Sequence, residues 1–376
     1  MRILLAPDSF KECLSTGDVA RALAEGCRRA RPDAKIDLAP MADGGEGTVE
    51  AMVVATDGRF VIAPTHDPLG NPIDARFGIL GDGRTAVIEM AAASGLALVP
   101  VERRHPGFTT TYGTGELLLH AIDQGVRRII VGLGGSATND AGAGMAQALG
   151  YGLRDDSDRE LSFGGFALAR LHWIDSMKVR EGLRYVEVTG AYDVDSPLCG
   201  PDGASYLFGP QKGASPKTCE MLDAALGHFA KYVEEEYGTS ISRMPGAGAA
   251  GGLGAGLVVF CKAELKPGFG VVADACGLEE RIRRADIVIT GEGKLDRQSL
   301  RGKVPVSVAR LAKSLGVRCW AVAGRCEPDL GKDLADIGIE GFIDLTSLAG
   351  SAETSLADPA RYLSDAAEHI TRTAVG

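Results

Sequence analysis

The sequence lacks the residue groupings that mark a zinc centre or a disulfide framework. Its eight cysteines are scattered with no CxxC pair, and its six histidines form neither HxxxH nor HExxH. This spacing disfavours a zinc site, and we expect the thiols to be reduced. A metal that acts here must be held by carboxylates, and oxygen ligands favour Mg²⁺.

Long apolar runs and an excess of positive charge are also missing. No stretch reaches the ~20 apolar residues of a membrane span, and the first residues show neither a basic n-region nor a cleavage site. The formal net charge of -10 gives no electrostatic footprint for nucleic acid or an anionic membrane. We expect a cytoplasmic protein with small-molecule partners and neither nucleic acid nor membrane as a partner; its oligomeric state is left open, a homodimer included.

Glycine is abundant instead. The chain has 51 glycines in 376 residues, nearly twice the usual share of about 7%. Most lie in turns beside apolar runs, which indicates tight or functional loops. The length exceeds what one hydrophobic core usually serves, so two domains are expected.

One glycine turn follows a predicted strand over residues 128–133 and precedes a small-residue helix. Backbone N–H groups at such a turn converge and favour an anion such as phosphate. The alternative is a turn that only packs tightly, because the pattern fits neither GxGxxG nor Walker A. The candidate phosphate-binding residues here are Gly134, Gly135, Ser136, Thr138, Asn139 and Asp140.

Two polar loops near the N-terminus follow predicted strands over residues 2–6 and 36–41. Ligands bind at the carboxyl ends of parallel strands, and a carboxylate there can hold Mg²⁺ while amides face an anion. The alternatives are an Asx-turn with a surface lysine in the first loop and helix capping by the acidic pair in the second. The candidates are Asp8, Ser9 and Lys11 in the first loop and Asp43, Gly44, Gly45 and Glu46 in the second.

The middle of the chain has a different sequence pattern. Residues 59–80 and 85–90 read as antiparallel hairpins, and a strand over 185–192 ends at Asp193. Gln211 and Lys212 lie among glycines, which suits ligand contact, although a surface lysine in a turn is the alternative. The glycine-rich stretch 245–256 predicts a close backbone approach or a tight helix start.

The βαβ pattern returns with a strand over residues 285–290. That strand leads into Glu292 and Asp296, and Lys303 opens the next helix. The simplest architecture is an α/β fold of two domains with the active site in the cleft between them. Residues 1–60 and 285–376 would form a discontinuous Rossmann- or flavodoxin-like parallel-sheet domain, and residues 61–284 an inserted α+β domain.

The ordered motifs resemble the signatures of the class I glycerate kinases over about residues 2–373. They are APDSFK (6–11), MADGGEGT (41–48), GGSATND (134–140), FGPQKG (208–213), PGAGAAGG (245–252) and TGEGKLD (290–296). The resemblance implies ATP-dependent phosphorylation of D-glycerate, with 2-phosphoglycerate as the expected product rather than 3-phosphoglycerate. Lys294 stands where arginine is frequent in the family, and Asp195-Ser196 where Thr-Asn is common.

A kinase must hold the γ-phosphoryl group in line with the hydroxyl, neutralise its charge with Mg²⁺ and cations, and exclude water. The sequence supplies candidates without assigning each role uniquely. Rival interpretations are a kinase for another small hydroxy acid and a non-enzymatic two-lobed small-molecule sensor. The catalytic candidates are Asp193, Lys11, Asp8, Glu292 and Asp296; the metal candidates are Asp43, Asp193 and Glu292; Lys11, Lys212 and Lys303 are candidates for contact with the phosphoryl group or the glycerate carboxylate.

Overall fold

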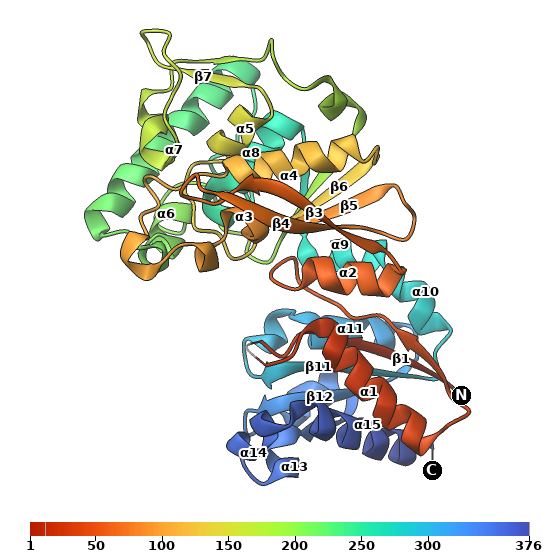
Figure 1. Ribbon diagram of the computed structural model, residues 1–376. Helices are drawn as coiled ribbons and strands as arrows, with labels where there is room; N and C mark the ends of the chain where they lie inside the picture. Colours follow the sequence, from red (N-terminus) through yellow and green to blue (C-terminus); the bar gives the residue numbers. More distant parts are fainter. Residues whose placement is uncertain (12, 376) are drawn as a thin grey trace. The chain divides into compact units, whose positions relative to one another are not determined.

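The computed structural model describes residues 1–11 and 13–375 (Figure 1). The chain forms two compact units, and each is described by itself. The first unit comprises Met1–Asp43, Glu50–Asp57 and the chain from Phe269 onward; the second comprises Gly44–Val49 and Gly58–Gly268. The sequence prediction placed the boundaries at residues 60 and 285, so it assigned residues 269–284 to the insertion, whereas they group with the first unit. The predicted interdomain cleft stays a prediction.

The first unit is built on a five-stranded parallel sheet. Its strand order is β13-β12-β11-β1-β2. Counted along the unit, this is the order 2-1-3-4-5 of flavodoxin-like doubly wound sheets, whose ligands bind where the winding reverses, between the first and third strands. These two strands are β1 and β11, and their pairing runs from Ile3–Ile287 to Pro7–Gly291. The strands are β1 (Arg2–Pro7), β2 (Lys35–Leu38), β11 (Ile287–Leu295), β12 (Arg318–Cys326) and β13 (Ile339–Asp344).

The helices of this unit follow the apolar periodicity of the sequence. In α1 (Thr16–Ala30), the Ser15 hydroxyl caps the first turn by accepting the Asp18 amide, and the buried face carries Leu23. Figure 1 shows α1 beside α15 (Pro359–Val375), and their apolar faces share one core with β1 and β11. The other helices are α2 (Thr48–Thr56), which starts in the second unit, α9 (Gly268–Ala275), α10 (Leu278–Arg283), α11 (Val304–Ser314), α12 (Gly331–Ile337), α13 (Leu345–Ala349) and α14 (Ala352–Ala357).

The second unit has a six-stranded mixed sheet in the order β10-β9-β6-β5-β4-β3. The β3-β4-β5 pairings are antiparallel, as the sequence predicts, but β5, β6, β9 and β10 run parallel. The α+β description is therefore wrong for most of this sheet, because the hairpin forms only one edge of a parallel α/β core. The strands are β3 (Arg59–His66), β4 (Pro72–Ile79), β5 (Thr85–Glu89), β6 (Arg128–Gly132), β9 (Glu187–Tyr192) and β10 (Glu264–Pro267), with a separate hairpin of β7 (Gly152–Arg154) and β8 (Trp173–Asp175).

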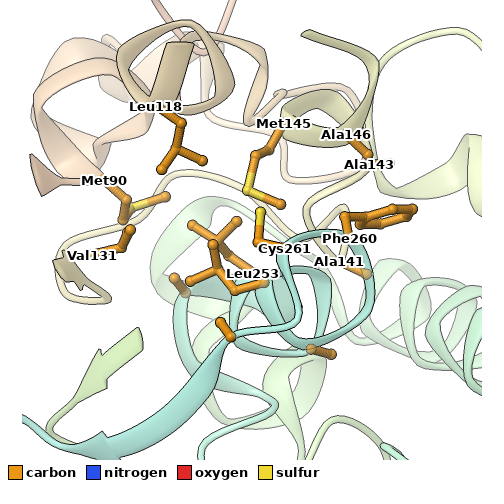
Figure 2. Close-up of a cluster of buried hydrophobic side chains, with 14 of the residues drawn as sticks. Met90, Leu118, Val131, Ala141, Ala143, Met145, Ala146, Leu253, Phe260 and Cys261 are labelled. Atoms are coloured by element: carbon orange, nitrogen blue, oxygen red, sulfur yellow. The ribbon is translucent and has the colours of Figure 1, made fainter. Parts of the chain in front are cut away.

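A large apolar core holds the second unit together. Figure 2 shows part of it, where Met90, Leu118, Val131, Met145 and Leu253 meet, all fully buried. Burial of such side chains contributes roughly 1.5–3 kcal/mol each. The helices are α3 (Ala91–Ser94), α4 (Tyr112–Asp123), α5 (Ala143–Ala148), α6 (Ala204–Phe208), α7 (Pro216–Tyr237) and α8 (Ala249–Cys261).

The glycine-rich stretch lies at the start of α8, where three consecutive residues have positive φ. A Cβ on Gly251 would lie 1.9 Å from the Thr138 carbonyl oxygen, and the Ala141 amide donates to the Gly251 carbonyl at 3.2 Å. The predicted close backbone approach is confirmed. No helix within the described residues is long and apolar enough to cross a membrane.

Candidate active site

A pocket of about 370 Å³ opens at the carboxyl ends of β1, β11 and β12 in the first unit. Its position is the one that the strand order predicts for a ligand, because β1 and β11 are the strands at which the winding reverses. Asp296, which was predicted with these residues, does not line it. The predicted site residues that line the pocket are Asp8, Ser9, Lys11, Asp43, Glu292 and Lys303.

Asp8 lies directly after β1 and is only 7% exposed. Its amide continues the sheet by donating to the Gly291 carbonyl at 2.8 Å, and its carboxylate accepts the Ser9 amide at 2.6 Å. Burial raises the pKa of Asp8 to about 7, helped by the negative charges of Asp43 and Glu292 and opposed by the Ser9 hydrogen bond. Asp8 can therefore exchange a proton near neutral pH.

Glu292 lies within β11 and is 6% exposed. Its Oε2 is 3.8 Å from Lys303 Nζ, while its buried Oε1 has no hydrogen-bond partner among the described residues. Burial raises the pKa of Glu292, and Ser299 and the charge of Lys303 partly offset this. A buried carboxylate oxygen without a donor is costly to keep, so this atom is suited to receive a cation or a proton from a ligand.

Asp296 shapes the loop behind the pocket. Its carboxylate accepts the Gln298 and Ser299 amides at 2.9 and 3.0 Å. It also lies 3.1 Å from Lys294 Nζ and 4.0 Å from Lys303 Nζ. Although burial acts in the other direction, the hydrogen bond from Lys294 lowers the pKa of Asp296. Asp296 is therefore an ionised group that positions two lysines.

The pocket offers oxygen ligands of the kind that Mg²⁺ prefers. Across residues 1–11 and 13–375, no three or more His, Cys, Asp or Glu side chains form a group that could enclose a metal ion. Mg²⁺ usually binds through one or two carboxylates and completes its shell with water and substrate phosphates. The carboxylates of Asp43 and Glu292 fit this mode of binding. Within the described residues, no group of protein side chains alone would enclose the ion.

One wall of the pocket was not predicted from the sequence. It comes from the end of β12 and from the helices that follow β13. The signal for it lies in the chain order, because β12 and β13 belong to the same parallel sheet as β1 and β11, and their carboxyl ends must reach the same edge. The residues of this wall include Arg325, Leu345, Thr346, Ala352, Leu356 and Pro359.

A second cluster of predicted residues lies in the second unit, around the loop after β6. Lys212 is only 2% exposed, and its Nζ donates to Ser136 Oγ at 2.7 Å and to the Thr138 carbonyl at 2.8 Å. Burial lowers the pKa of Lys212 to about 7, and the charge of Asp140 opposes this. The alternative of a surface lysine in a turn is wrong, since the amino group lies inside the unit; the predicted ligand contact stays a prediction.

Asp140 binds backbone amides at the end of the predicted phosphate loop, whose role stays a prediction. Its carboxylate accepts the Gly142 and Gly144 amides at 3.1 and 3.2 Å, and the Thr111 amide and hydroxyl at 2.9 Å each. Burial raises the pKa of Asp140, and these hydrogen bonds act against the rise. Asn139 Nδ2 donates to Ser205 Oγ at 2.8 Å. The amides at the start of α5 are therefore already hydrogen-bonded, whereas the buried Thr138 Oγ1 and Asn139 Oδ1 have no partner among the described residues.

The glycines of this loop allow two backbones to approach. A Cβ on Gly134 would lie 2.7 Å from Gly45 Cα, and a Cβ on Gly44 would lie 2.9 Å from the Ala191 carbonyl oxygen. The segment around Gly44 thus packs on the loops that follow β6 and β9. These close contacts agree with the alternative in which the turn only packs tightly. Gly135, in the same turn, has φ +71°.

The remaining predicted residues lie on the surface of the second unit. Asp193, directly after β9, and Glu46 and Gln211 are exposed. Their predicted functions stay predictions.

A flavodoxin-like parallel sheet with carboxylates and lysines in a pocket at its winding reversal is typical of an α/β protein that binds a small ligand. Comparison with known proteins makes this specific: the chain belongs to the glycerate kinase family, whose model matches residues 3–375. The predicted resemblance is therefore confirmed, and the chain is a member of a family of kinases.

Relatives cover nearly the whole chain. The glycerate kinase of Haemophilus influenzae is 46% identical over 372 residues, covering 99% of this chain and 98% of its own. The glycerate 2-kinase of Escherichia coli is 46% identical over 373 residues with the same coverage. A crystal structure assigned as glycerate kinase 2 from Salmonella typhimurium LT2 superposes with a TM-score of 0.89 at 44% identity, covering 99% of this chain and 98% of that one.

Proposed function

We propose that this protein transfers the γ-phosphoryl group of ATP to the 2-hydroxyl of D-glycerate, giving 2-phosphoglycerate and ADP. The names of relatives at 46% identity support the substrate and the phosphorylated position. The observation that carries the proposal within this chain is the pocket at the ends of β1 and β11, where Asp8, Asp43 and Glu292 meet Lys11 and Lys303. Family membership argues against a non-enzymatic sensor.

Asp8 is the proposed general base. A base works best when its pKa lies near the operating pH, and burial places the pKa of Asp8 at about 7. In the reaction the hydroxyl oxygen would form a bond to the γ-phosphorus, its proton would pass to the Asp8 carboxylate, and the bond to ADP would break. Asp193 is the other candidate for this proton.

Asp43 and Glu292 are the proposed ligands of Mg²⁺. The buried Glu292 Oε1 has no hydrogen-bond partner among the described residues, so a bound cation would stabilise this atom. The ion would supply charge neutralisation at the phosphoryl oxygens. Lys303, held 3.8 Å from Glu292 Oε2, and the exposed Lys11 would face the same oxygens.

The proposal is tested with purified protein, ATP and Mg²⁺ against D-glycerate, L-glycerate, lactate and tartronate, with ADP release measured by a coupled assay. We expect D-glycerate to give the highest kcat/KM and ¹³C and ³¹P NMR to show phosphate on C2. A product phosphorylated on C3 would overturn the position, and a better acid in the panel would overturn the substrate. Activity that survives complete chelation of divalent ions would overturn the role of Mg²⁺.

A further inference from the structure

The pocket of the first unit is lined mainly by apolar surface, which is unexpected for a site that would hold only glycerate. Glycerate consists of a carboxylate and two hydroxyl groups on a three-carbon chain, so it has almost nothing to bury against hydrocarbon. The lining nevertheless includes Leu345, Leu356 and Pro359 from α13, α14 and the start of α15. An apolar wall contributes affinity only for a ligand with apolar surface of its own.

The size of the pocket leads to the same conclusion. Its volume of about 370 Å³ lies within the range of ~300–1,000 Å³ that is usual for ligands of drug size. A three-carbon acid would leave most of that space to water. A nucleotide, with a flat aromatic base and a chain of phosphates, uses both the volume and the wall.

Charge is distributed to match such a ligand. In a protein with a formal net charge of -10, the pocket gathers four cationic side chains beside three carboxylates, and the carboxylates are the proposed base and metal ligands. The cations are Lys11, Lys294, Lys303 and Arg325; the carboxylates are Asp8, Asp43 and Glu292. The exposed Arg325 side chain makes no hydrogen bond or ion pair with the residues that the structure describes. Several cations beside an apolar wall suit a polyanion that carries an aromatic base.

We propose that this pocket is the nucleotide site and that the adenine lies on the apolar wall while the phosphates extend toward Lys303 and Lys11. Leu356 is the informative residue of the wall. It is 65% exposed although it lines the pocket, so a bound base would remove its side chain from water. This inference rests on the proposed ATP-dependent reaction and adds which part of the chain recognises the nucleotide.

The test is isothermal titration calorimetry of the full-length protein with ADP and Mg²⁺, and with inorganic tripolyphosphate, which has the charge but no base. Leu356→Ser is compared with Leu348→Ser, a matched control on α13 that is also exposed, at 46%, and does not line the pocket. We expect L356S to raise the Kd for ADP ~5–20-fold, the scale of one partly buried leucine. The Kd for tripolyphosphate should stay unchanged, and L348S should match the wild type for both ligands.

Three results would overturn the inference. One is no binding of ADP by the wild type, another an unchanged Kd for ADP in L356S, and the third an L356S variant that alters only the KM for glycerate. The assay of the wild type separates these failures from failure of the proposed function: if the protein phosphorylates glycerate while L356S binds ADP normally, the reaction stands and the nucleotide lies elsewhere. Because Leu356 is exposed, the substitution should not prevent folding, which the Tm of both variants checks.

Discussion

The first unit's pocket and the second unit's loop cluster contain the same types of residue in opposite environments. In the pocket, Glu292 keeps a buried oxygen without a hydrogen-bond partner among the described residues. In the loop cluster, Lys212 and Asp140 use their polar atoms on the surrounding chain. The loop cluster also keeps two buried oxygens without a partner among the described residues, Thr138 Oγ1 and Asn139 Oδ1, so the difference lies in the buried charged groups: those of the loop are hydrogen-bonded to the surrounding chain, whereas Glu292 keeps one oxygen free for a ligand.

The pKa values follow the same division. Burial raises the pKa of Asp8 to about 7 and lowers the pKa of Lys212 to about 7. Asp8 lines a pocket that a ligand can enter. Lys212 is buried, and its Nζ donates to Ser136 and to the Thr138 carbonyl. A shifted pKa alone therefore does not distinguish a reactive group from a structural one.

The largest expected effect is that of Asp8→Asn on catalysis. If Asp8 takes the hydroxyl proton, kcat should fall by ~10²–10⁴-fold. Asp193→Asn, measured beside it, assigns the base: the variant with the larger loss identifies the residue. A D8N variant that keeps most of its kcat would contradict the proposed role.

The same variant has a stability signature. The folded-state pKa of Asp8, about 7, lies above its ordinary value of 3.8, so the folded protein binds the extra proton between these values, and stability falls as the pH rises through that window. D8N removes the charge that is unfavourable at pH 8. Its Tm should exceed that of the wild type there by ~2–4 °C or more, and the gain should shrink toward pH 4. A lower Tm at pH 8 would show that the carboxylate is structural.

The next effect concerns the metal. Glu292→Gln keeps the shape of the side chain but weakens a ligand of a hard cation, so kcat should fall by ~10²-fold and the Mg²⁺ concentration needed for half-maximal rate should rise. Glu340→Gln is the control, because Glu340 pairs with Arg318 on the surface of the same unit at 2.7 Å. Equal Mg²⁺ requirements in both variants would remove Glu292 from the metal site.

Lys212→Met should act on stability more than on chemistry. It leaves Ser136 and the Thr138 carbonyl without their donor, which costs roughly 1–3 kcal/mol. The folded-state pKa of about 7 lies below the ordinary 10.5, so Lys212 makes the wild type more stable as the pH rises from 7 toward 10. The Tm difference between the wild type and K212M should therefore widen over this range. Lys217→Met, at an exposed position on α7, is the control, and a K212M variant with normal Tm but a ~10²-fold lower kcat would make Lys212 a substrate-contacting residue.

The smallest effects separate packing glycines from replaceable ones. Gly134→Ala places a Cβ 2.7 Å from Gly45 Cα, and such overpacking costs ~1–3 kcal/mol. Gly227→Ala on α7 meets no atom within 4 Å and should instead stabilise the helix by ~0.5–1 kcal/mol. Urea unfolding measures both. Unchanged stability in G134A together with a raised KM for ATP would favour the phosphate interpretation of this loop.

The sequence predicted what depends on local pattern. Apolar runs that end in polar loops located the strands and placed Asp8 and Glu292 directly after two of them. The structure brings both residues to one pocket. The antiparallel hairpin over residues 59–80 was also predicted from a local sequence pattern.

The remaining features depend on tertiary packing. Whether Lys212 is a surface group or an enclosed one follows from how α6 and the loop after β6 pack, and no local pattern records that. The parallel pairing of β5, β6, β9 and β10 joins segments far apart in the chain. The pocket wall at Leu345 and Leu356 required knowing that β13 forms the sheet edge beside β12.

Hydrogen–deuterium exchange of the wild-type protein with and without ADP and Mg²⁺ tests the central comparison most directly. A ligand that binds in the pocket of the first unit should slow exchange at residues 8–11, 292–303 and 345–356. The loop of residues 134–144 should exchange at the same rate in both conditions, because the account places the nucleotide in the first unit and the Gly142 and Gly144 amides of this loop already donate to Asp140. Protection confined to residues 134–144 and 210–213, with none in the pocket of the first unit, would contradict the account.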